Sequence, residues 1–495
     1  MAAPSSSHPR LTTPSLRTLA LLAALTVASI VVHGYHPYVE DSEIYTPGIK
    51  QQLNPALYPQ NNVFFASHAH LTLFPNLIAW SIRLTHLPLD WALLLWQFLC
   101  TFLLLLGCWK IGRLVFRDSL APWGGASLVA ALLTIPVAGT ALYIADQYLT
   151  TRSISTATVL FIVLNAVQRR WIRASLWALF TALIHPLMVG FGVAYVVVLL
   201  LLDWRSTQPH RSPGYAALLP LGLFPPVTDA YRDVLNSRSY FFLLRWEWYE
   251  WVGIFAPLLL LAWFAALAKR QGLDLLRRMC QALIVFGLLF TAAGAALTIP
   301  VRFANLAELQ PMRAFHLLYV LLFVFAGGLL AQFVLQRYVW RWLALFLPLC
   351  AGMSYAQLQL YPASPHLELP CAAPRNLWVE AFLWVRHNTP LDAYFALDPH
   401  YLQAPGEDQH GFRALAERSR LADAVKDSGA VTMFPKLAET WRDQVRAQTN
   451  WADFTVDDFR ALHSRFGVTW VVLEKPVPGL TCPYENSGLR VCEIP

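Results

Sequence analysis

The sequence predicts a polytopic α-helical membrane protein with a small C-terminal α/β domain. Three observations lead to this prediction. Of the 495 residues, 56% are hydrophobic and 14% are charged, whereas soluble domains carry about 25% charged residues. Several apolar runs reach the roughly 20 residues that a helix needs to cross the hydrocarbon of a bilayer. From residue 357 to 495 the composition becomes more charged, and strand-like and helical runs alternate.

The N-terminal part predicts a membrane anchor. Residues 1–16 are rich in Ser, Thr and Pro and are expected to form a disordered cytoplasmic segment. Arg10 and Arg17 then precede the apolar run 19–32. A signal peptide would need a small-residue cleavage site, and none is clear. We therefore favour a retained anchor whose N-terminus is cytoplasmic.

The predicted transmembrane domain covers residues 17–356 and contains about eleven helices. A long external loop at 36–65 follows the anchor, and a juxtamembrane helix is expected at 68–87. Basic clusters fall on one side of this topology, as the positive-inside tendency requires. Besides the anchor, crossings are expected at about 89–109, 120–143, 153–168, 172–185, 187–203, 213–227, 250–268, 279–298, 314–335 and 339–356.

The external loop 36–65 holds the first candidate functional residues. Glu40, Asp41 and Glu43 lie beside the anchor among three Tyr and four Pro residues. Acidic groups at a membrane edge must be solvated, paired or bound to something positive. Such a carboxylate can act as a general base, stabilise an oxocarbenium ion or hold a divalent metal. The simpler alternative is a solvated acidic loop.

Other polar residues are predicted on the same external face. Asp146 and Arg152 share the short turn 145–153, where they either pair with each other or bind a ligand, Arg152 being suited to a phosphate. His185 precedes Pro186 at a break between two apolar runs, and it either satisfies freed carbonyls or has a function. Arg313 begins a late helix where a lipid phosphate would lie, or it snorkels to the interface.

The C-terminal tail predicts a small α/β domain at 357–495. Arg413, Glu417, Arg418 and Lys426 have the spacing of a solvated helix face. Cys482 and Cys492 either form a disulfide in an oxidising compartment or remain free thiols. Strand-like runs lie at 393–397, 469–473 and 489–494, and helical patterns lie at 376–387, 411–425, 435–446 and 456–466.

An N-terminal anchor, an external loop with an acidic motif, many membrane helices and an external C-terminal domain together resemble the GT-C superfamily of membrane glycosyltransferases. This superfamily includes oligosaccharyltransferase catalytic subunits, protein O-mannosyltransferases and the aminoarabinose transferases of lipid A. The motifs behind the resemblance are EDSEIY at 40–45 and DQYLTTRS at 146–153. The tail lacks the WWDYG-like residues of oligosaccharyltransferases. The chain looks more like bacterial members with an EDxxIYxP-like loop, an HP break and a PxR sequence before a late helix.

The resemblance implies transfer of a hexose or pentose from a polyprenyl-phosphate-linked donor to a glycan, lipid or protein acceptor. The reaction would occur on the extracytoplasmic side of a bacterial inner membrane. Asp41 or Glu40 occupies the place of the catalytic acid–base or metal-binding residue, and Asp146 lies in the second acidic loop. In an inverting displacement, Asp41 would deprotonate the acceptor, and Arg152 or Arg313 would neutralise the leaving phosphate. Any Mg²⁺ or Mn²⁺ would lie at Asp41 and Asp146.

Two alternatives remain. A ligase or polymerase of envelope glycans would depend on external Arg and His residues more than on the acidic loop. A transporter or flippase would show repeated halves and charges paired across the membrane midplane, and neither is apparent. The formal net charge of +7 comes from basic residues beside apolar segments rather than in one patch, so nucleic acid is not an expected partner.

Overall fold

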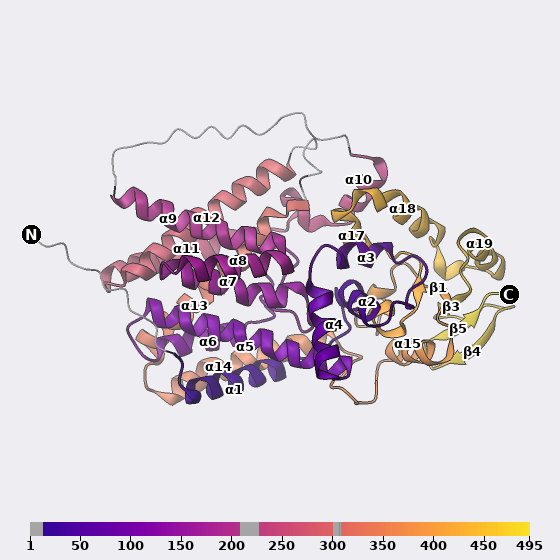
Figure 1. Cartoon of the computed structure of the whole chain (residues 1–495), viewed down its shortest axis with the longest axis horizontal. Helices are drawn as coiled ribbons and strands as arrows, with labels where there is room; N and C mark the ends of the chain where they lie inside the picture. The colour runs from indigo at the N-terminus through magenta and orange to yellow at the C-terminus, as the bar shows by residue number, and fades with distance from the viewer. Residues whose placement is uncertain (1–12, 208–226, 300–305, 307) are drawn as a thin grey trace, which may run out of the picture.

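The computed structural model describes residues 13–207, 227–299, 306 and 308–495. A helical bundle forms one end of the elongated molecule, and a small α/β unit forms the other (Figure 1). The helices up to the end of the bundle are α1 (Leu16–His33), α2 (Ser42–Leu53), α3 (Val63–Ala69), α4 (Phe74–Thr85), α5 (Leu89–Val115), α6 (Ala121–Ala131), α7 (Thr151–Val167), α8 (Trp171–Ile184), α9 (Pro186–Thr207), α10 (Asp229–Asn236), α11 (Trp248–Arg270), α12 (Asp274–Thr298), α13 (Phe315–Leu330) and α14 (Val339–Leu360).

The chain is a multi-pass membrane protein. In the described part, seven helices are long and apolar enough to cross a membrane, and α7 and α8 are shorter apolar helices. The expected crossing at 213–227 lies outside the described residues. The seven spans are Leu16–His33, Leu89–Val115, Pro186–Trp204, Trp248–Arg270, Asp274–Thr298, Pro311–Leu335 and Val339–Leu360.

The helix expected at 120–143 is much shorter in the structure. Helix α6 ends at Ala131, and a turn-rich segment leads from there to α7. Pro136 cannot donate a backbone hydrogen bond, and Ala138 and Ala141 have positive φ angles of 46° and 54°. Apolar composition alone therefore overestimated this helix, because its sequence also contains turn residues.

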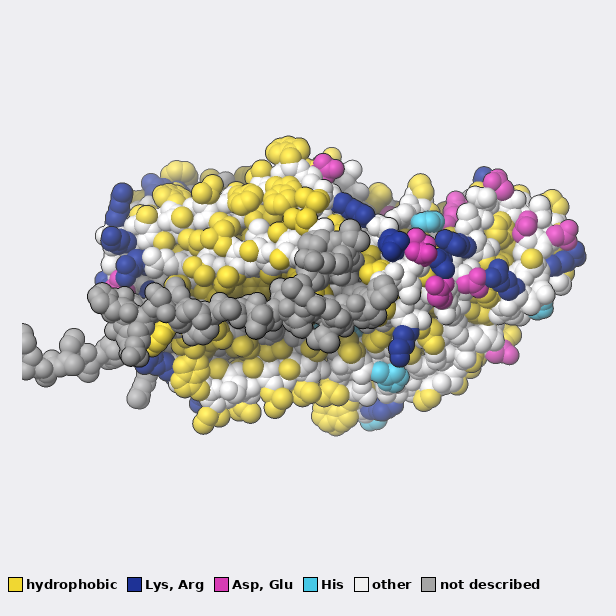
Figure 2. All heavy atoms as spheres, turned by 90° about the horizontal axis from the view of Figure 1, so that it is seen from above, with side chains coloured by type: hydrophobic (Ala, Val, Ile, Leu, Met, Phe, Trp, Pro, Cys, Tyr) yellow, Lys and Arg dark blue, Asp and Glu magenta, His cyan; other side chains and the backbone are white. Residues whose placement is uncertain are grey.

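The surface of the bundle matches a lipid environment. Leu259 and Trp263 on α11 are 71% and 61% exposed, and Leu347 on α14 is 62% exposed. Figure 2 shows hydrophobic side chains over the visible face of the bundle, with Lys and Arg side chains gathered at its ends. Large apolar side chains are costly to expose to water over such an area, whereas lipid tails accommodate them.

Close helix contacts hold the bundle together where the side chains are small. Helices α6 and α13 pack against each other, and Gly124 and Gly327 face one another across the contact. A Cβ on either glycine would collide with the backbone of the opposite helix. Small residues of this kind allow membrane helices to approach closely, which strengthens their van der Waals contacts.

The loop 36–65, which the sequence predicts to be external, is ordered and lies between the bundle and the C-terminal unit. It contains α2 and leads into α3, and α4 lies within the expected juxtamembrane region 68–87. Backbone hydrogen bonds join Tyr35 to His366, Glu40 to Gln409, and Gly411 to Tyr38. The segment that carries the acidic motif is therefore held on the C-terminal unit by main-chain contacts.

The C-terminal unit has a five-stranded mixed sheet with the order β2-β1-β3-β5-β4. Strand β1 pairs in parallel with β2 and β3, whereas β5 pairs antiparallel with β3 and β4. Cys482 and Cys492 of β4 and β5 form a disulfide. The elements of this unit are α15 (Leu377–Asn388), β1 (Tyr394–Ala396), α16 (Phe412–Ala416), β2 (Ser419–Arg420), α17 (Asp427–Met433), α18 (Ala438–Ala447), α19 (Val456–Phe466), β3 (Trp470–Leu473), β4 (Thr481–Glu485) and β5 (Arg490–Glu493).

The expected helix at 411–425 is wrong in most of its length. Helix α16 ends at Ala416, and the chain then forms β2 at the edge of the sheet. Glu417 adopts a left-handed conformation with a φ of 54°, which ends the helix. Local sequence favoured a helix here, but pairing with β1 determined the structure.

Candidate functional site

Arg152 joins the two acidic loops. Its Nη2 donates to Asp41 Oδ2 at 3.0 Å and to Asp146 Oδ2 at 2.9 Å, and its Nε donates to the same Asp146 oxygen at 3.2 Å. The side chains of Asp146 and Arg152 are 6% and 10% exposed, whereas that of Asp41 is 31% exposed. Asp41 is therefore the carboxylate of this pair that solvent or a ligand reaches most easily.

Local structure explains how these three side chains meet. Asp41 immediately precedes α2, and Arg152 lies in the first turn of α7. Thr150 and Ser153 form a capping box that starts α7. A side chain of α5 also holds the second loop, since Gln97 Nε2 donates to the Asp146 carbonyl at 2.7 Å.

A lysine from the C-terminal unit completes the site. Lys426 Nζ contacts Glu40 Oε2 and lies 3.2 Å from Asp41 Oδ1. Its side chain is 9% exposed, and that of Glu40 is 27% exposed. Asp41 thus lies between two cations, one from α7 and one from the C-terminal unit.

The two carboxylates that share Arg152 differ in their pKa. Desolvation opposes ionisation of Asp41, but Lys426 and Arg152 outweigh it and hold the pKa of Asp41 well below its usual range. Burial raises the pKa of Asp146, although Arg152 acts in the opposite direction. Neighbouring carboxylates whose environments push their pKa values apart are common in catalytic sites. Asp41 therefore ionises at a lower pH than Asp146.

His185 and Arg313 lie close enough to the site to act on it electrostatically. Both feel the charge of Arg152, and Arg313 also feels that of Asp41. Arg313 lies over the ring of Tyr240, 5.8 Å from its centroid, and its Nε has no hydrogen-bond partner in the described part of the chain. No hydrogen bond or ion pair joins His185 or Arg313 to Asp41, Asp146 or Arg152 among the described contacts.

A small cavity lies behind the acidic pair. Its volume is about 10 Å³, and its lining includes Tyr143, Asp146, Arg152 and His316. His316 Nε2 lies 3.0 Å from the Ile144 carbonyl. A polar cavity of this size is at the lower limit for one water molecule. It does not hold a sugar in this conformation.

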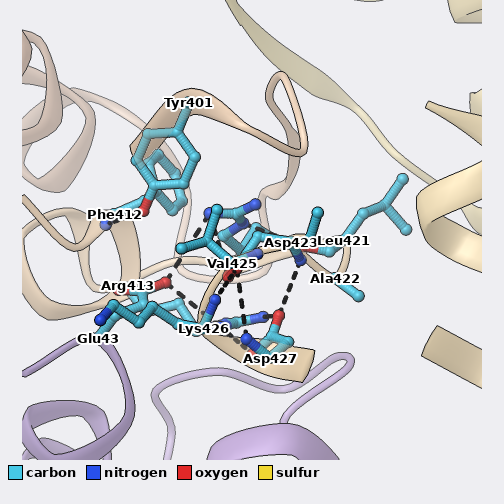
Figure 3. Close-up of polar contacts among 12 residues, drawn as sticks. Glu43, Tyr401, Phe412, Arg413, Leu421, Ala422, Asp423, Val425, Lys426 and Asp427 are labelled. Atoms are coloured by element: carbon cyan, nitrogen blue, oxygen red, sulfur yellow. Dashed lines mark hydrogen bonds and ion pairs between the residues drawn. The ribbon is translucent and has the colours of Figure 1, made fainter. Parts of the chain in front are cut away.

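Glu43 points away from this region into the C-terminal unit. Its carboxylate lies 3.3 Å from Arg413 Nη1 and accepts from the Ala414 N–H at 3.2 Å. Arg413 also makes two hydrogen bonds to Asp427, at 2.9 and 2.8 Å (Figure 3). Glu43, Arg413 and Asp427 have side chains at most 1% exposed. Gly411 packs on Glu43 so closely that a Cβ there would contact its carboxylate.

The prediction of a solvated helix face at Arg413, Glu417, Arg418 and Lys426 is wrong. Arg413, Arg418 and Lys426 are buried, and Glu417 pairs with Lys50 at 2.8 Å. The sequence RALAERSRLADAVKD has the alternating charges of an exposed helix. Only the Ala and Leu residues between the charges indicate that this segment is buried. That pattern is too weak to identify Lys426 as a partner of Asp41.

The donor set does not favour a metal ion. Within the part of the chain that the structure describes, no group of three or more His, Cys, Asp or Glu side chains is arranged to hold one. Arg152 and Lys426 already contact the carboxylate oxygens of Asp41, and Arg152 contacts Asp146. Two side-chain cations therefore already lie at the carboxylate oxygens that a metal ion would use.

A second buried charge cluster lies beside the acidic loop. Glu368 Oε1 lies 2.7 Å from His36 Nδ1 and 3.0 Å from His410 Nε2. Burial disfavours the charged imidazole, but the Glu368 carboxylate outweighs it and raises the pKa of His410 from 6.5 to about 9. Burial would raise the pKa of Glu368, but the charge and hydrogen bonds of the two histidines lower it from 4.5 to about 2. This cluster ties the loop to the C-terminal unit.

We expect this cluster to make folding stability depend on pH. The raised pKa of His410 means that its contribution is complete below about pH 6.5 and is lost as the pH rises through about 9. The lowered pKa of Glu368 means that its contribution is complete above about pH 4.5 and is lost as the pH falls towards about 2. Thermal unfolding of wild type and His410→Gln tests this, with a difference of about 2 kcal/mol at pH 6 that shrinks at pH 10. An equal difference at both pH values would contradict it.

Comparisons with known proteins show a similarity in overall fold. No protein-family model matches the chain, and no curated protein matches it. Two solved structures of an oligosaccharyltransferase from the archaeon Archaeoglobus fulgidus match over 92% of this chain and 69% of theirs. The apo form has 11% sequence identity and a TM-score of 0.47. The AglB complex with an inhibitory peptide and a dolichol-phosphate has 12% and 0.46. The expected likeness to oligosaccharyltransferases is found in the overall fold alone, and at these scores it supports no inference about the site.

Proposed function

We propose that this protein is a membrane glycosyltransferase that moves a sugar from a polyprenyl-phosphate-linked donor to an acceptor on the extracytoplasmic side. One observation carries the proposal: Arg152 joins Asp41 of the first external loop to Asp146 of the second. This arrangement places an accessible carboxylate beside a buried guanidinium at the predicted external edge of the bundle. Transfer of a sugar needs both groups, one for the acceptor hydroxyl and one for the phosphate that departs.

In the proposed reaction, Asp41 accepts the proton of the acceptor as the acceptor oxygen attacks the anomeric carbon. The bond from that carbon to the phosphate oxygen breaks, and Arg152 or Arg313 stabilises the negative charge on the leaving phosphate. Asp41 is a weak base while both Arg152 and Lys426 contact it, because they hold its pKa low. We therefore propose that the donor phosphate draws one of these cations away from Asp41, which strengthens the base when the donor is bound.

Lys426 provides a test of this electrostatic balance. Replacing Lys426 with Gln removes one of the two cations and is expected to raise the pKa of Asp41 towards its ordinary value of 3.8. The acidic limb of the kcat/KM profile against pH should then move to higher pH. The exposed Lys436→Gln is a matched control. An unchanged acidic limb in an active Lys426→Gln enzyme would contradict this role for Lys426.

The proposed function is tested with purified protein in lipid nanodiscs. Polyprenyl-phosphate-linked hexoses and pentoses are supplied with an extract of envelope glycans and lipids, and release of polyprenyl phosphate is measured. We expect release that depends on the acceptor and is lost in Asp41→Asn. The variants Arg313→Ala and His185→Ala distinguish the proposed glycosyltransferase from a glycan ligase. A ligase would lose more activity in these two variants than in Asp41→Asn. Full activity of Asp41→Asn in folded protein would overturn the proposal.

A further inference from the structure

A large cavity lies at the far end of the bundle from the candidate site. Its volume is about 550 Å³, and it is lined by the ends of α5, α7 and α9 and the start of α12. Helix α7 has 17 residues and begins at the candidate site, so the two regions are roughly 25 Å apart at 1.5 Å per residue. This is the end that the basic residues predict to be cytoplasmic. It is separate from the proposed site of sugar transfer.

The polar side chains that line this cavity are mostly basic, and the rest of the lining is mostly apolar. Four arginines contribute to it and only two carboxylates, Asp203 and Asp274, oppose them. Arg278 uses one nitrogen on Asp203 at 3.1 Å, and Arg117 donates to the Gly272 carbonyl at 3.2 Å. The arginines are Arg113, Arg117, Arg169 and Arg278, and the apolar lining includes Val115, Leu199, Leu200 and Leu275.

Two buried N–H donors in this lining lack acceptors. Gln168 Nε2 and Arg278 Nε have no hydrogen-bond partner among the described residues. A buried donor without an acceptor costs about 1–3 kcal/mol, so an anion with several oxygens would be stabilised here. The positive-inside tendency accounts for basic residues at this end, but it does not account for their convergence on a cavity with unsatisfied donors.

We infer that this cavity binds the phosphate-bearing headgroup of an anionic phospholipid. Phosphate oxygens match guanidinium donors in geometry and charge. The apolar part of the lining suits the start of the acyl chains, which free phosphate lacks. This cavity and the proposed sugar-transfer site lie at different ends of the molecule. Binding of a phospholipid here does not depend on sugar transfer there.

The test uses the full-length protein, purified in detergent and depleted of lipid. Phosphatidylglycerol, phosphatidylcholine and inorganic phosphate are titrated separately, and binding is followed by native mass spectrometry and by the shift in Tm. Wild type is compared with Arg113→Gln/Arg169→Gln and with Arg270→Gln, whose exposed arginine at the end of α11 does not line the cavity. Gln168→Leu removes one unsatisfied donor, and it replaces the double variant in the comparison if the double variant does not fold.

We expect phosphatidylglycerol to bind wild type and Arg270→Gln equally, and to bind the double variant about tenfold or more weakly, because charge-assisted hydrogen bonds are lost. Gln168→Leu should weaken the binding of phosphatidylglycerol and leave the binding of phosphatidylcholine unchanged. Equal binding of phosphatidylglycerol to all folded variants would overturn the inference. Binding of phosphatidylcholine as tight as that of phosphatidylglycerol would overturn it as well. Saturation by inorganic phosphate alone at the same concentration would exclude the lipid as the occupant.

Discussion

Replacement of Asp41 with Asn is expected to lower the rate of sugar transfer by about 10²–10⁴-fold, the range that a positioned general base contributes. Asn keeps the shape of the side chain but cannot take the acceptor proton. Asp41 is the accessible carboxylate of the pair bound by Arg152, so the loss should be mainly in kcat. The measurement is release of polyprenyl phosphate from a lipid-linked sugar, with expression and Tm recorded in parallel.

The matched control for this change is Asp392→Asn. Asp392 is exposed and lies in the C-terminal unit between α15 and β1, so its replacement should leave transfer within about twofold of wild type, as is usual for surface positions. A similar loss of activity in both variants would show that the assay reports general damage. Wild-type activity in folded Asp41→Asn would exclude Asp41 as the base.

Replacement of Arg413 with Met is expected to lower the free energy of unfolding by about 3–5 kcal/mol, the usual cost of removing one partner from a buried ion pair. Glu43 and Asp427 would lose a guanidinium that contacts both of them, and both are fully buried. The buried Arg420 lies 3.9 Å from Glu43 and cannot replace those hydrogen bonds. Because Glu43 belongs to the loop 36–65, detachment of this loop from the C-terminal unit should accompany unfolding.

Thermal unfolding and limited proteolysis measure this effect, with Arg460→Met as the control. Arg460 pairs with Asp457 on the surface, and their side chains are 54% and 82% exposed, so its loss should change stability by less than about 1 kcal/mol. The double variant Glu43→Gln/Arg413→Met should recover part of the stability, because it also neutralises a stranded carboxylate. Equal Tm values for Arg413→Met and Arg460→Met would contradict a stabilising role for the buried network.

The sequence pattern predicted several helices well, both in the bundle and in the C-terminal unit. The crossing expected at 250–268 corresponds to α11, which spans Trp248–Arg270, and the helix expected at 456–466 corresponds to α19. Prediction failed where local and tertiary preferences conflict. The run 120–143 is apolar, but Pro136 lies within it and the helix ends before this residue. At 411–425 strand pairing overrides a helical pattern.

The candidate site was partly visible in the sequence for a physical reason. Asp41, Asp146 and Arg152 all lie in loops that the basic clusters assign to one face, and membrane topology restricts where such residues meet. The contact of Lys426 with Asp41 could not be predicted, because 385 positions separate the two residues. Only the folding of the C-terminal unit brings them together. The division of the acidic motif, with Asp41 towards Arg152 and Glu43 towards Arg413, also depends on that fold.

The most direct test of the central claim is an experimental structure of the full-length protein in a nanodisc with polyprenyl phosphate bound. We expect the phosphate to lie about 3 Å from the guanidinium of Arg152 or Arg313. Asp41 should face the space beside the phosphate, and at least one of its present contacts with Arg152 and Lys426 should be longer. A phosphate bound away from both arginines, with the Asp41, Arg152 and Lys426 contacts unchanged, would contradict it.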